Sequence, residues 1–207
     1  MDLRVLSLPP LGANCYLLKL PGRPDGLVID PGGASEVVVN TCHELGMTPS
    51  AILLTHGHFD HVGGVEGLLA AYPGLPVYAH PGDFAPAFAP SDLFPLDPGS
   101  LSSRVELYDN QKLSVAGIEL TVFYTPGHSK GSVVFRTEDS LFTGDTLFCG
   151  SMGRTDFPGG SVGEMLASLK RLGELEGDLK VYPGHNSPTT LETERRTNPY
   201  LVEAMAR

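Results

Sequence analysis

Three histidines and an aspartate crowd a seven-residue segment in the first third of the chain. The segment is Thr55-His56-Gly57-His58-Phe59-Asp60-His61. It follows a short apolar run and precedes apolar residues at helical spacing, so we expect it to form a turn between a strand and a helix. Buried polar groups need partners, and so many titratable groups in one turn indicate a functional site rather than a packing arrangement.

Three later positions repeat this arrangement of a ligand-type side chain after an apolar run. His128 follows the letters YTPG, Asp145 follows LFTG and His185 follows VYPG. Each run ends in glycine, which permits a sharp turn at the end of a strand. Because strand ends at one edge of a sheet are a common place for a site, we expect these side chains to meet the first cluster.

Imidazoles and carboxylates are ligands of zinc and iron, whereas calcium and magnesium call for more oxygen ligands. Five histidines and two aspartates exceed what one tetrahedral ion with an open position can use, so they suit two ions with one bridging carboxylate. A bridging hydroxide would leave such a site with a net charge of about +1, which stabilises a forming oxyanion. Each ion also lowers the pKa of its water from 15.7 toward about 7. The pattern therefore favours hydrolysis at a carbonyl or at phosphorus.

The rest of the sequence predicts an α/β protein in which sheet is covered by helices. Short apolar or β-branched runs bounded by Gly, Pro, Asp or Asn predict ten strands. They span residues 5–8, 15–20, 27–29, 51–54, 77–79, 113–115, 118–124, 133–136, 141–143 and 179–182. Residues 81–103 lack a clear period and are expected to form an irregular insertion with at most one short helix.

Four helices are predicted from caps and apolar spacing. Ser35 is expected to cap the first, and a second should run from about Val62 until Pro73-Gly74 stops it. Ser161 and Glu164 form a capping box for the third. Thr189 and Glu192 form a weaker box, and that last helix should end before Pro199.

The length is compatible with one large domain or two small ones, and we expect a single domain over residues 1–207. Hydrophobic residues make up 41% of the 207, enough for a substantial core, and the 25 Gly and 18 Pro are scattered without an obvious domain boundary. The net charge of −10 disfavours nucleic acid as a partner, and no apolar run is long enough for a membrane span or a signal peptide. Three widely spaced cysteines fit a reduced, cytoplasmic protein, and the oligomeric state is left open.

Taken together, these motifs resemble those of the metallo-β-lactamase superfamily. The match comprises His56-x-His58-x-Asp60-His61, then His128, Asp145 and His185 in that order, and the turn Val28-Ile29-Asp30-Pro31-Gly32. The resemblance implies a four-layer αββα sandwich, with two mixed sheets face to face and helices outside.

The resemblance also implies a ligand set for two divalent ions, with zinc expected first and iron or manganese also suited. His56, His58 and His128 would hold one ion; Asp60, His61 and His185 would hold the other. Asp145 would bridge them. Asp60 and Asp145 are the expected catalytic carboxylates, with Asp60 also helping to orient the hydroxide. Asp30 would orient the site from outside the ligand set, or it is a simple turn residue.

Two further segments resemble the short glyoxalase II-like hydrolases of the YcbL type. They are residues 150–160, GSMGRTDFPGG, and residues 194–199, ERRTNP. This resemblance implies a thioesterase in which the hydroxide attacks a thioester carbonyl of a small molecule, such as one derived from glutathione. The sequence stops about where the helical glutathione-binding domain of full-length glyoxalase II would expand, which leaves specificity for glutathione open.

The Gly-Arg-Thr-Asp element also resembles the persulfide dioxygenases of the same superfamily. These use one iron, held at positions matching His56, His128 and Asp145. A mononuclear iron enzyme of that type is the alternative to the hydrolase. A β-lactamase is a less favoured assignment. An RNA-processing enzyme is less favoured still, because it would need a nucleic-acid-binding appendage for which the chain has neither the length nor the charge.

Several other residues are candidates for substrate binding or for packing. Lys130 and Arg154 could hold a substrate carboxylate, although Lys130 could equally be a solvated lysine and Arg154 is expected rather to pair with Asp156 or a backbone carbonyl. Cys149 is expected to be a small buried residue outside the ligand set. We expect ordinary packing or surface roles for His43 and His80, and either pocket or core positions for Phe84, Phe88 and Phe94.

Overall fold

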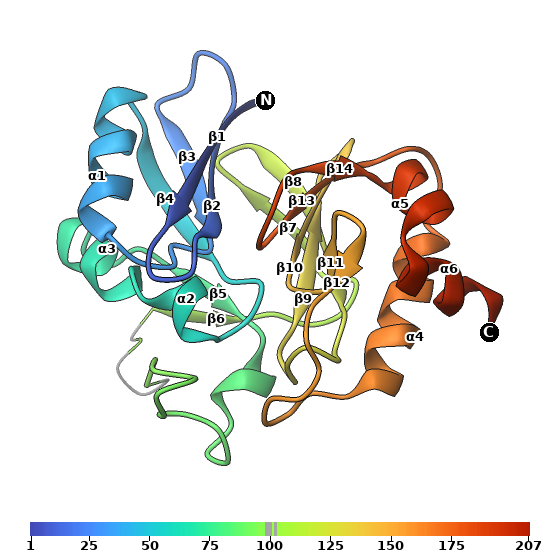
Figure 1. The fold of residues 1–207 in the computed structure, drawn as a ribbon. Coiled ribbons are helices and arrows are strands. Elements are labelled where there is room, and N and C mark those ends of the chain that lie inside the picture. The colour runs from blue at the N-terminus through green and yellow to red at the C-terminus, as the bar shows by residue number, and fades with distance from the viewer. Residues whose placement is uncertain (98–100, 102) are drawn as a thin grey trace.

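Two six-stranded mixed sheets lie face to face in the computed structural model, with helices on both outer faces (Figure 1). The structure describes residues 1–97, 101 and 103–207. The fold confirms the predicted four-layer αββα arrangement. In Figure 1 the amino-terminal helices flank one sheet and the carboxy-terminal helices flank the other, so the strands fill the middle.

The first sheet is built from the amino-terminal half of the chain in the order β1-β2-β3-β4-β5-β6. Its first three strands are antiparallel, and β3 to β6 run parallel. The strands are β1 (Asp2–Leu8), β2 (Ala13–Lys19), β3 (Asp25–Ile29), β4 (Thr48–Leu53), β5 (Val77–Ala79) and β6 (Arg104–Glu106).

The second sheet has the order β14-β13-β10-β9-β8-β7, and its one parallel pair is β10 with β13. Its strands are β7 (Lys112–Val115), β8 (Ile118–Tyr124), β9 (Val133–Arg136), β10 (Ser140–Gly144), β13 (Lys180–Pro183) and β14 (Thr189–Thr190). A small hairpin of β11 (Leu147–Phe148) and β12 (Ser151–Met152) follows β10.

Helices cover the outer face of each sheet. The first sheet is covered by α1 (Ser35–Glu44) and α3 (Val65–Ala71), and the second by α4 (Val162–Gly173) and α6 (Pro199–Ala206). The shorter helices are α2 (Phe59–Val62), the 3-10 helix η1 (Pro81–Phe84) and α5 (Leu191–Thr197). In the described part of the chain, every helix is too short or too polar to cross a membrane.

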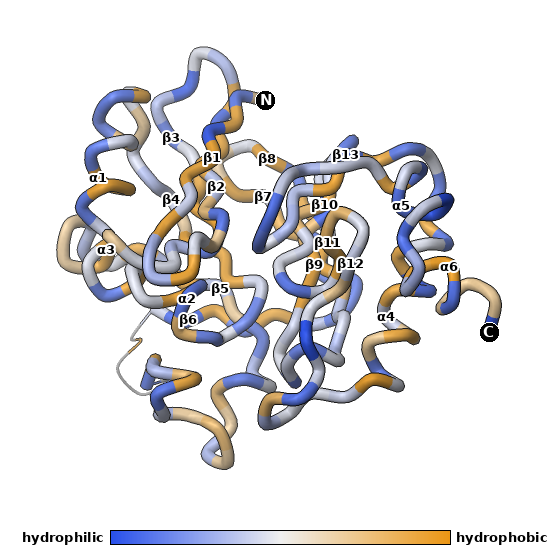
Figure 2. Tube along the Cα trace, in the orientation of Figure 1, coloured by the Kyte–Doolittle hydropathy of each residue, from blue (hydrophilic) through white to orange (hydrophobic). Residues whose placement is uncertain are grey.

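Side chains of the first sheet are apolar on both faces. Leu17, Val28 and Ile52 pack beneath α1 and α3, whereas Leu18 and Leu27 point the opposite way and pack against the second sheet. Alternate residues of a strand face opposite sides, so a sheet covered on both sides needs apolar residues at consecutive positions. This explains the continuous apolar runs of the sequence, which colour the central strands orange in Figure 2.

The ten predicted strands are all present, and the strands missed by the prediction are β6, β11, β12 and β14. β11, β12 and β14 have two residues each, too few for a pattern to show. β6 has the sequence RVE, in which two of three residues are charged, so no apolar run marks it. In the segment predicted to be irregular, residues 81–103, the described residues contain one regular element, η1. Residues 98–100 and 102 of this segment lie outside the described part of the chain.

Helix starts were predicted less well. Ser161 caps α4 as expected, accepting a hydrogen bond from the Glu164 backbone. The prediction of Ser35 as a cap was wrong, because Ala34 occupies that position with a φ of 42°. The helix predicted from Thr189 is α5, which begins one residue later than expected, with Thr190 as its cap, and ends before Pro199 as predicted. The helix that follows it, α6, was not predicted; Asn198 caps it by accepting hydrogen bonds from Tyr200 N and Leu201 N.

The helix predicted from Val62 is interrupted and becomes α2 and α3, with Gly63 and Gly64 between them. A Cβ on Gly64 would lie 2.8 Å from the Pro31 carbonyl oxygen, and one on Gly63 would lie 2.7 Å from that of Gly32. Two glycines are therefore needed where this turn meets the Asp30 loop.

We expect Ser161→Ala to lower the free energy of unfolding by about 1 kcal/mol, because the first turn of α4 loses its side-chain acceptor. Ser35→Ala is the matched control: Ser35 lies inside the first turn of α1, and its loss should leave stability nearly unchanged. Urea denaturation of both variants measures the difference. If both variants lost the same free energy of unfolding, the conclusion that Ser161 caps a helix and Ser35 does not would be contradicted.

Candidate metal centre

The seven predicted ligand side chains converge at one end of the two sheets. His56, His58, Asp60 and His61 lie in the segment after β4 and in α2, which follow the first sheet. The other three extend from the second sheet. They are His128 after β8, Asp145 after β10 and His185 after β13. The cluster therefore forms only where the two sheets meet.

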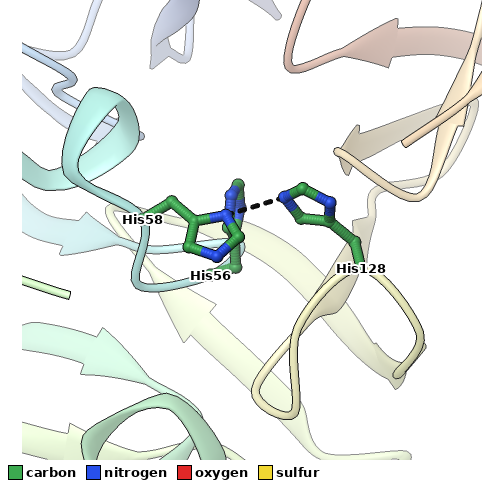
Figure 3. A group of neighbouring side chains, drawn as sticks. All are labelled: His56, His58 and His128. Atoms are coloured by element: carbon green, nitrogen blue, oxygen red, sulfur yellow. Dashed lines mark hydrogen bonds between the residues drawn. The ribbon is translucent and has the colours of Figure 1, made fainter. Parts of the chain in front are cut away.

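His56, His58 and His128 form a first group, with one ring nitrogen of each within 4.8 Å of the others. All three are buried, at 3%, 2% and 3% exposure. His58 Nδ1 lies 2.8 Å from His128 Nε2, and Figure 3 shows these rings reaching toward each other from separate loops. Three imidazole nitrogens converging in this way could hold a divalent ion.

Hydrogen bonds on the far side of two rings determine which nitrogen is available to a metal. His128 Nδ1 donates to the Arg154 carbonyl at 2.8 Å, which leaves the lone pair on Nε2. The Thr55 hydroxyl donates to Asp30 at 2.6 Å, so at 3.1 Å it can only accept from His56 Nδ1. His56 Nε2 then carries a lone pair, and this buried atom has no hydrogen-bond partner among the described residues. Such an orphaned acceptor fits a metal ligand.

Asp60, His61 and His185 form a second group within the same limit of 4.8 Å. His185 Nε2 lies 3.2 Å from Asp60 Oδ2 and 3.4 Å from His61 Nε2. Two imidazoles and one carboxylate again match the donors that zinc and iron prefer.

Asp145 lies between the two groups. Its carboxylate oxygens are 3.3 Å from His61 Nε2, 3.5 Å from His128 Nε2 and 3.7 Å from His185 Nε2. One carboxylate thus reaches both groups, as a bridging ligand must. The donor set of the seven side chains therefore fits a dinuclear metal site.

The electrostatics of the cluster favour neutral His56 and His58 and an ionised Asp145. Burial and the neighbouring His128 lower the pKa of His58 to about 3, and burial together with the surrounding imidazoles lowers the pKa of His56. Burial by itself would raise the pKa of Asp145, but the His61 and His128 imidazoles hold it below its ordinary value. Metals bind neutral imidazole and ionised carboxylate, so His56, His58 and Asp145 are in their ligating forms at neutral pH. Burial alone would lower the pKa of His61, but the carboxylates of Asp145 and Asp30 raise it, so a metal ion bound there would displace its proton.

Asp30 makes more contacts than a simple turn residue would. Its buried carboxylate accepts from the Thr55 backbone at 2.7 Å, from the Thr55 hydroxyl at 2.6 Å and from His61 Nδ1 at 3.0 Å. Its φ of 50° is unusual for a residue other than glycine and directs the side chain into the cluster. Asp30 therefore orients His61 and fixes the loop that begins with Thr55.

Asp83 is a positioning residue that the sequence did not reveal. Its carboxylate, 1% exposed, accepts from Gly57 N at 2.8 Å, Gly131 N at 2.6 Å and the Ser129 hydroxyl at 2.8 Å. These donors flank the histidines of the first group on two separate loops. Asp83 lies in an aperiodic segment, where an acidic residue carries no signal of burial.

Asn14 and Tyr16 hold the loop that carries His185. The Asn14 amide donates to Pro183 O at 3.0 Å and to Asn186 O at 2.9 Å, and the Tyr16 hydroxyl donates to Pro183 O at 2.5 Å. Both residues lie on β2, so the first sheet positions the loop of His185, a candidate ligand that follows a strand of the second sheet.

The remaining predicted residues are placed as follows. Lys130 pairs with Glu164 at 2.9 Å, and Arg154 makes a two-point contact with Asp156 at 2.7 and 2.8 Å. The expectation that Cys149 is buried was wrong, because it is exposed in the turn between β11 and β12.

The other histidines and the aromatic residues of the insertion lie mostly in packing positions. His43 is exposed on α1, and His80 stacks on Tyr124 with a centroid separation of 4.4 Å. Phe84 belongs to the core beneath the first sheet, whereas the Phe94 ring packs against His58 at 4.7 Å.

A pocket of about 420 Å³ opens over both groups. Arg154 lines it and Lys130 does not. The lining residues are Leu11, His58, Phe59, Asp60, Leu93, His128, Asp145, Phe148, Arg154, Phe157 and His185. A small molecule can therefore reach the converging ligands from solvent.

Sequence comparison places the chain in a known family. The metallo-beta-lactamase superfamily pattern matches residues 8–185, so the chain belongs to this superfamily. It is 38% identical to the uncharacterized Mycobacterium tuberculosis protein Rv2581c, over 92% of this chain and 93% of that one. It is 30% identical to the hydroxyacylglutathione hydrolase GloC of Haemophilus influenzae, over 97% and 98% of the two chains. A hydroxyacylglutathione hydrolase of Xylella fastidiosa is 38% identical, over 87% of this chain and 64% of that enzyme.

Solved structures show the same fold. The B3 metallo-beta-lactamase BLEG-1 superposes with a TM-score of 0.86 at 33% identity, covering 97% of this chain and 99% of its own. TTHA1623 in a di-iron-bound form superposes with a TM-score of 0.81 at 37% identity, covering 95% of this chain and 99% of its own. ETHE1 from Myxococcus xanthus superposes with a TM-score of 0.81 at 25% identity, covering 100% of this chain and 91% of its own.

We expect Asp83→Asn to weaken metal binding about tenfold and to lower the free energy of unfolding by about 2 kcal/mol. An amide would place an N–H group against donors of the two loops that the carboxylate now joins. Asp92→Asn, an exposed change in the same segment, is the control and should alter neither quantity. Chelator competition and urea denaturation measure the effects; an Asp83→Asn variant with native metal affinity would contradict this role.

Proposed function

We propose that this protein is a metal-dependent hydrolase that cleaves a small-molecule thioester with two divalent ions. The position of Asp145 carries the proposal, because its carboxylate lies within 3.3–3.7 Å of ligand nitrogens from both groups. The first ion would be held by His56, His58 and His128. The second would be held by Asp60, His61 and His185, with Asp145 shared.

Zinc, iron and manganese all accept this donor set, and zinc is the expected ion. The similarity to TTHA1623, solved with two irons, supports two ions and keeps iron as an alternative to zinc.

Bound ions of this kind make hydroxide available from water at neutral pH and polarise a carbonyl oxygen. The protein contributes orientation and charge. The carboxylate of Asp60 is ionised, because hydrogen bonding to His185 and the His61 imidazole keep its pKa low although burial opposes this. It can therefore accept a hydrogen bond from the attacking oxygen. Addition of that oxygen to the carbonyl carbon and cleavage of the carbon–sulfur bond give a carboxylic acid and a thiol.

The thioester assignment is supported by the two hydroxyacylglutathione hydrolases among the relatives. A glutathione-derived thioester is therefore the first substrate to test. The cysteines are all free, which fits a reducing cytoplasm, and the two sheets share one core, which fits a single domain over residues 1–207.

Metal analysis combined with an S-lactoylglutathione assay tests the proposal. We expect two equivalents of metal per chain and thioester hydrolysis that is lost on chelation and recovered on adding metal. Two equivalents without hydrolysis of any thioester would retain the metal centre and remove the substrate class.

Single ligand replacements test the two groups separately. His128→Ala should abolish the first site and His185→Ala the second, so each should reduce the bound metal from two equivalents to one. His43→Ala, an exposed change on α1, should keep both equivalents. Metal analysis after dialysis measures the outcome, and two equivalents retained in either ligand variant would exclude that residue from the set.

A persulfide dioxygenase-like enzyme with one iron is the second candidate, favoured by the Gly-Arg-Thr-Asp segment at residues 153–156. His56, His128 and Asp145 would then hold the iron. The convergence of Asp60, His61 and His185 favours the dinuclear hydrolase instead. Oxygen consumption with glutathione persulfide, compared with thioester hydrolysis, separates the two candidates.

A further inference from the structure

The walls of the pocket above the metal ligands are apolar. Five segments each contribute one apolar side chain: Leu11, Phe59, Leu93, Phe148 and Phe157. Leu11, in the turn between β1 and β2, is 61% exposed. A large apolar side chain exposed at a pocket mouth is a common mark of a ligand-binding surface.

Two of these side chains stand beside the two metal-ligand groups. The Phe157 ring centroid is 5.8 Å from that of His58 in the first group, and the Phe148 centroid is 6.0 Å from that of His185 in the second. A molecule whose reacting bond lies over Asp145 would therefore meet an aromatic ring on each side.

The cationic side chains near this pocket already have partners. Among the described residues that line the pocket, Arg154 is the one charged residue that is not a proposed metal ligand. Its guanidinium donates twice to Asp156, and its Cζ lies 3.8 Å from the centre of the Phe157 ring. Lys130 is held by both oxygens of Glu164 at 2.9 and 3.1 Å. A carboxylate on a substrate would find no unpaired cation among these groups.

We infer that the enzyme prefers thioesters whose thiol portion is uncharged and at least partly apolar, and that it hydrolyses thioesters of anionic thiols, glutathione included, less efficiently. This inference rests on the proposed thioesterase function and names its substrate class. An anionic thiol portion would lose water against apolar walls without gaining a charged partner, which is costly. The net charge of −10 also repels anions as they approach.

The test compares two thioesters that differ by one carboxylate. They are the lactoyl thioesters of N-acetylcysteamine, which is neutral, and of N-acetylcysteine, which adds a carboxylate to the same skeleton. We expect kcat/KM to be about tenfold higher for the neutral thioester, corresponding to about 1.4 kcal/mol. Leu11→Ala should raise KM for the neutral thioester severalfold with little change in kcat, because this exposed residue supports no core.

A second variant changes the charge of the pocket directly. Asp156→Asn should release the Arg154 guanidinium and raise kcat/KM for the anionic thioester only. The ratio of kcat/KM for the neutral thioester to that for the anionic one should therefore fall. Asp25→Asn is the matched control. It breaks the equivalent two-point pair between Arg23 and Asp25, with bonds of 2.8 and 2.7 Å, and makes the same charge change outside the pocket lining. It should leave the ratio unchanged.

Titration calorimetry can measure how tightly each of the two free thiols binds the metal-loaded protein. This measurement does not depend on hydrolysis. Tighter binding of N-acetylcysteamine, reduced by Leu11→Ala, supports the inference. Equal or tighter binding of N-acetylcysteine, or an equal or higher kcat/KM for its thioester, overturns it. Selective thiol binding without hydrolysis of either thioester would overturn the proposed function and retain the selectivity of the pocket.

Discussion

Burying four imidazoles and two carboxylates, beside the half-buried His185, at the junction of two sheets is the constraint on which this structure depends. Each group loses water on burial, so each needs a partner, and the partners come from across the junction. Asn14 and Tyr16 on β2 hold the loop of His185, although that loop follows the second sheet. Asp83 joins the loops of His58 and His128 in the same manner. The relative position of the two sheets is therefore also the geometry of the metal centre.

The two segments that resemble the short hydrolases are in contact. Glu194, 1% exposed, accepts hydrogen bonds from Gly150 N and from the Asn198 amide, both at 2.8 Å, and that amide donates to Ser151 O at 2.9 Å. The carboxy-terminal helices thus hold the β11–β12 hairpin, which carries Phe148 in the pocket wall. The segment after the hairpin supplies the Arg154 carbonyl that orients His128. Residues far from the ligands therefore shape both the wall and the centre.

The polarity of the site changes from its base to its opening. The base holds the ligating nitrogens and oxygens, where charge develops during hydrolysis and polar partners are useful. The walls hold leucine and phenylalanine, and the nearest guanidinium is neutralised by Asp156. In the function proposed here, chemistry and selectivity therefore depend on separate residues. The base follows the superfamily pattern. The walls come from the loops of Leu11, Leu93 and Phe157, from the start of α2 and from the β11–β12 hairpin, short connecting segments in which one scaffold most readily accommodates different substrates.

The sequence by itself predicted the seven candidate ligand residues that converge, the superfamily, ten of the strands and the cap of α4, because each leaves a local mark in spacing or residue type. It placed the start of α1 wrongly, since Ser35 looks like a cap and only the backbone at Ala34 decides otherwise. The tertiary structure alone decided the roles of Asp83 and Asn14, the contact of Glu194 with Gly150 and the pairing of Lys130 with Glu164. These contacts join residues distant along the chain, and a residue's type does not show which distant backbone group it will meet.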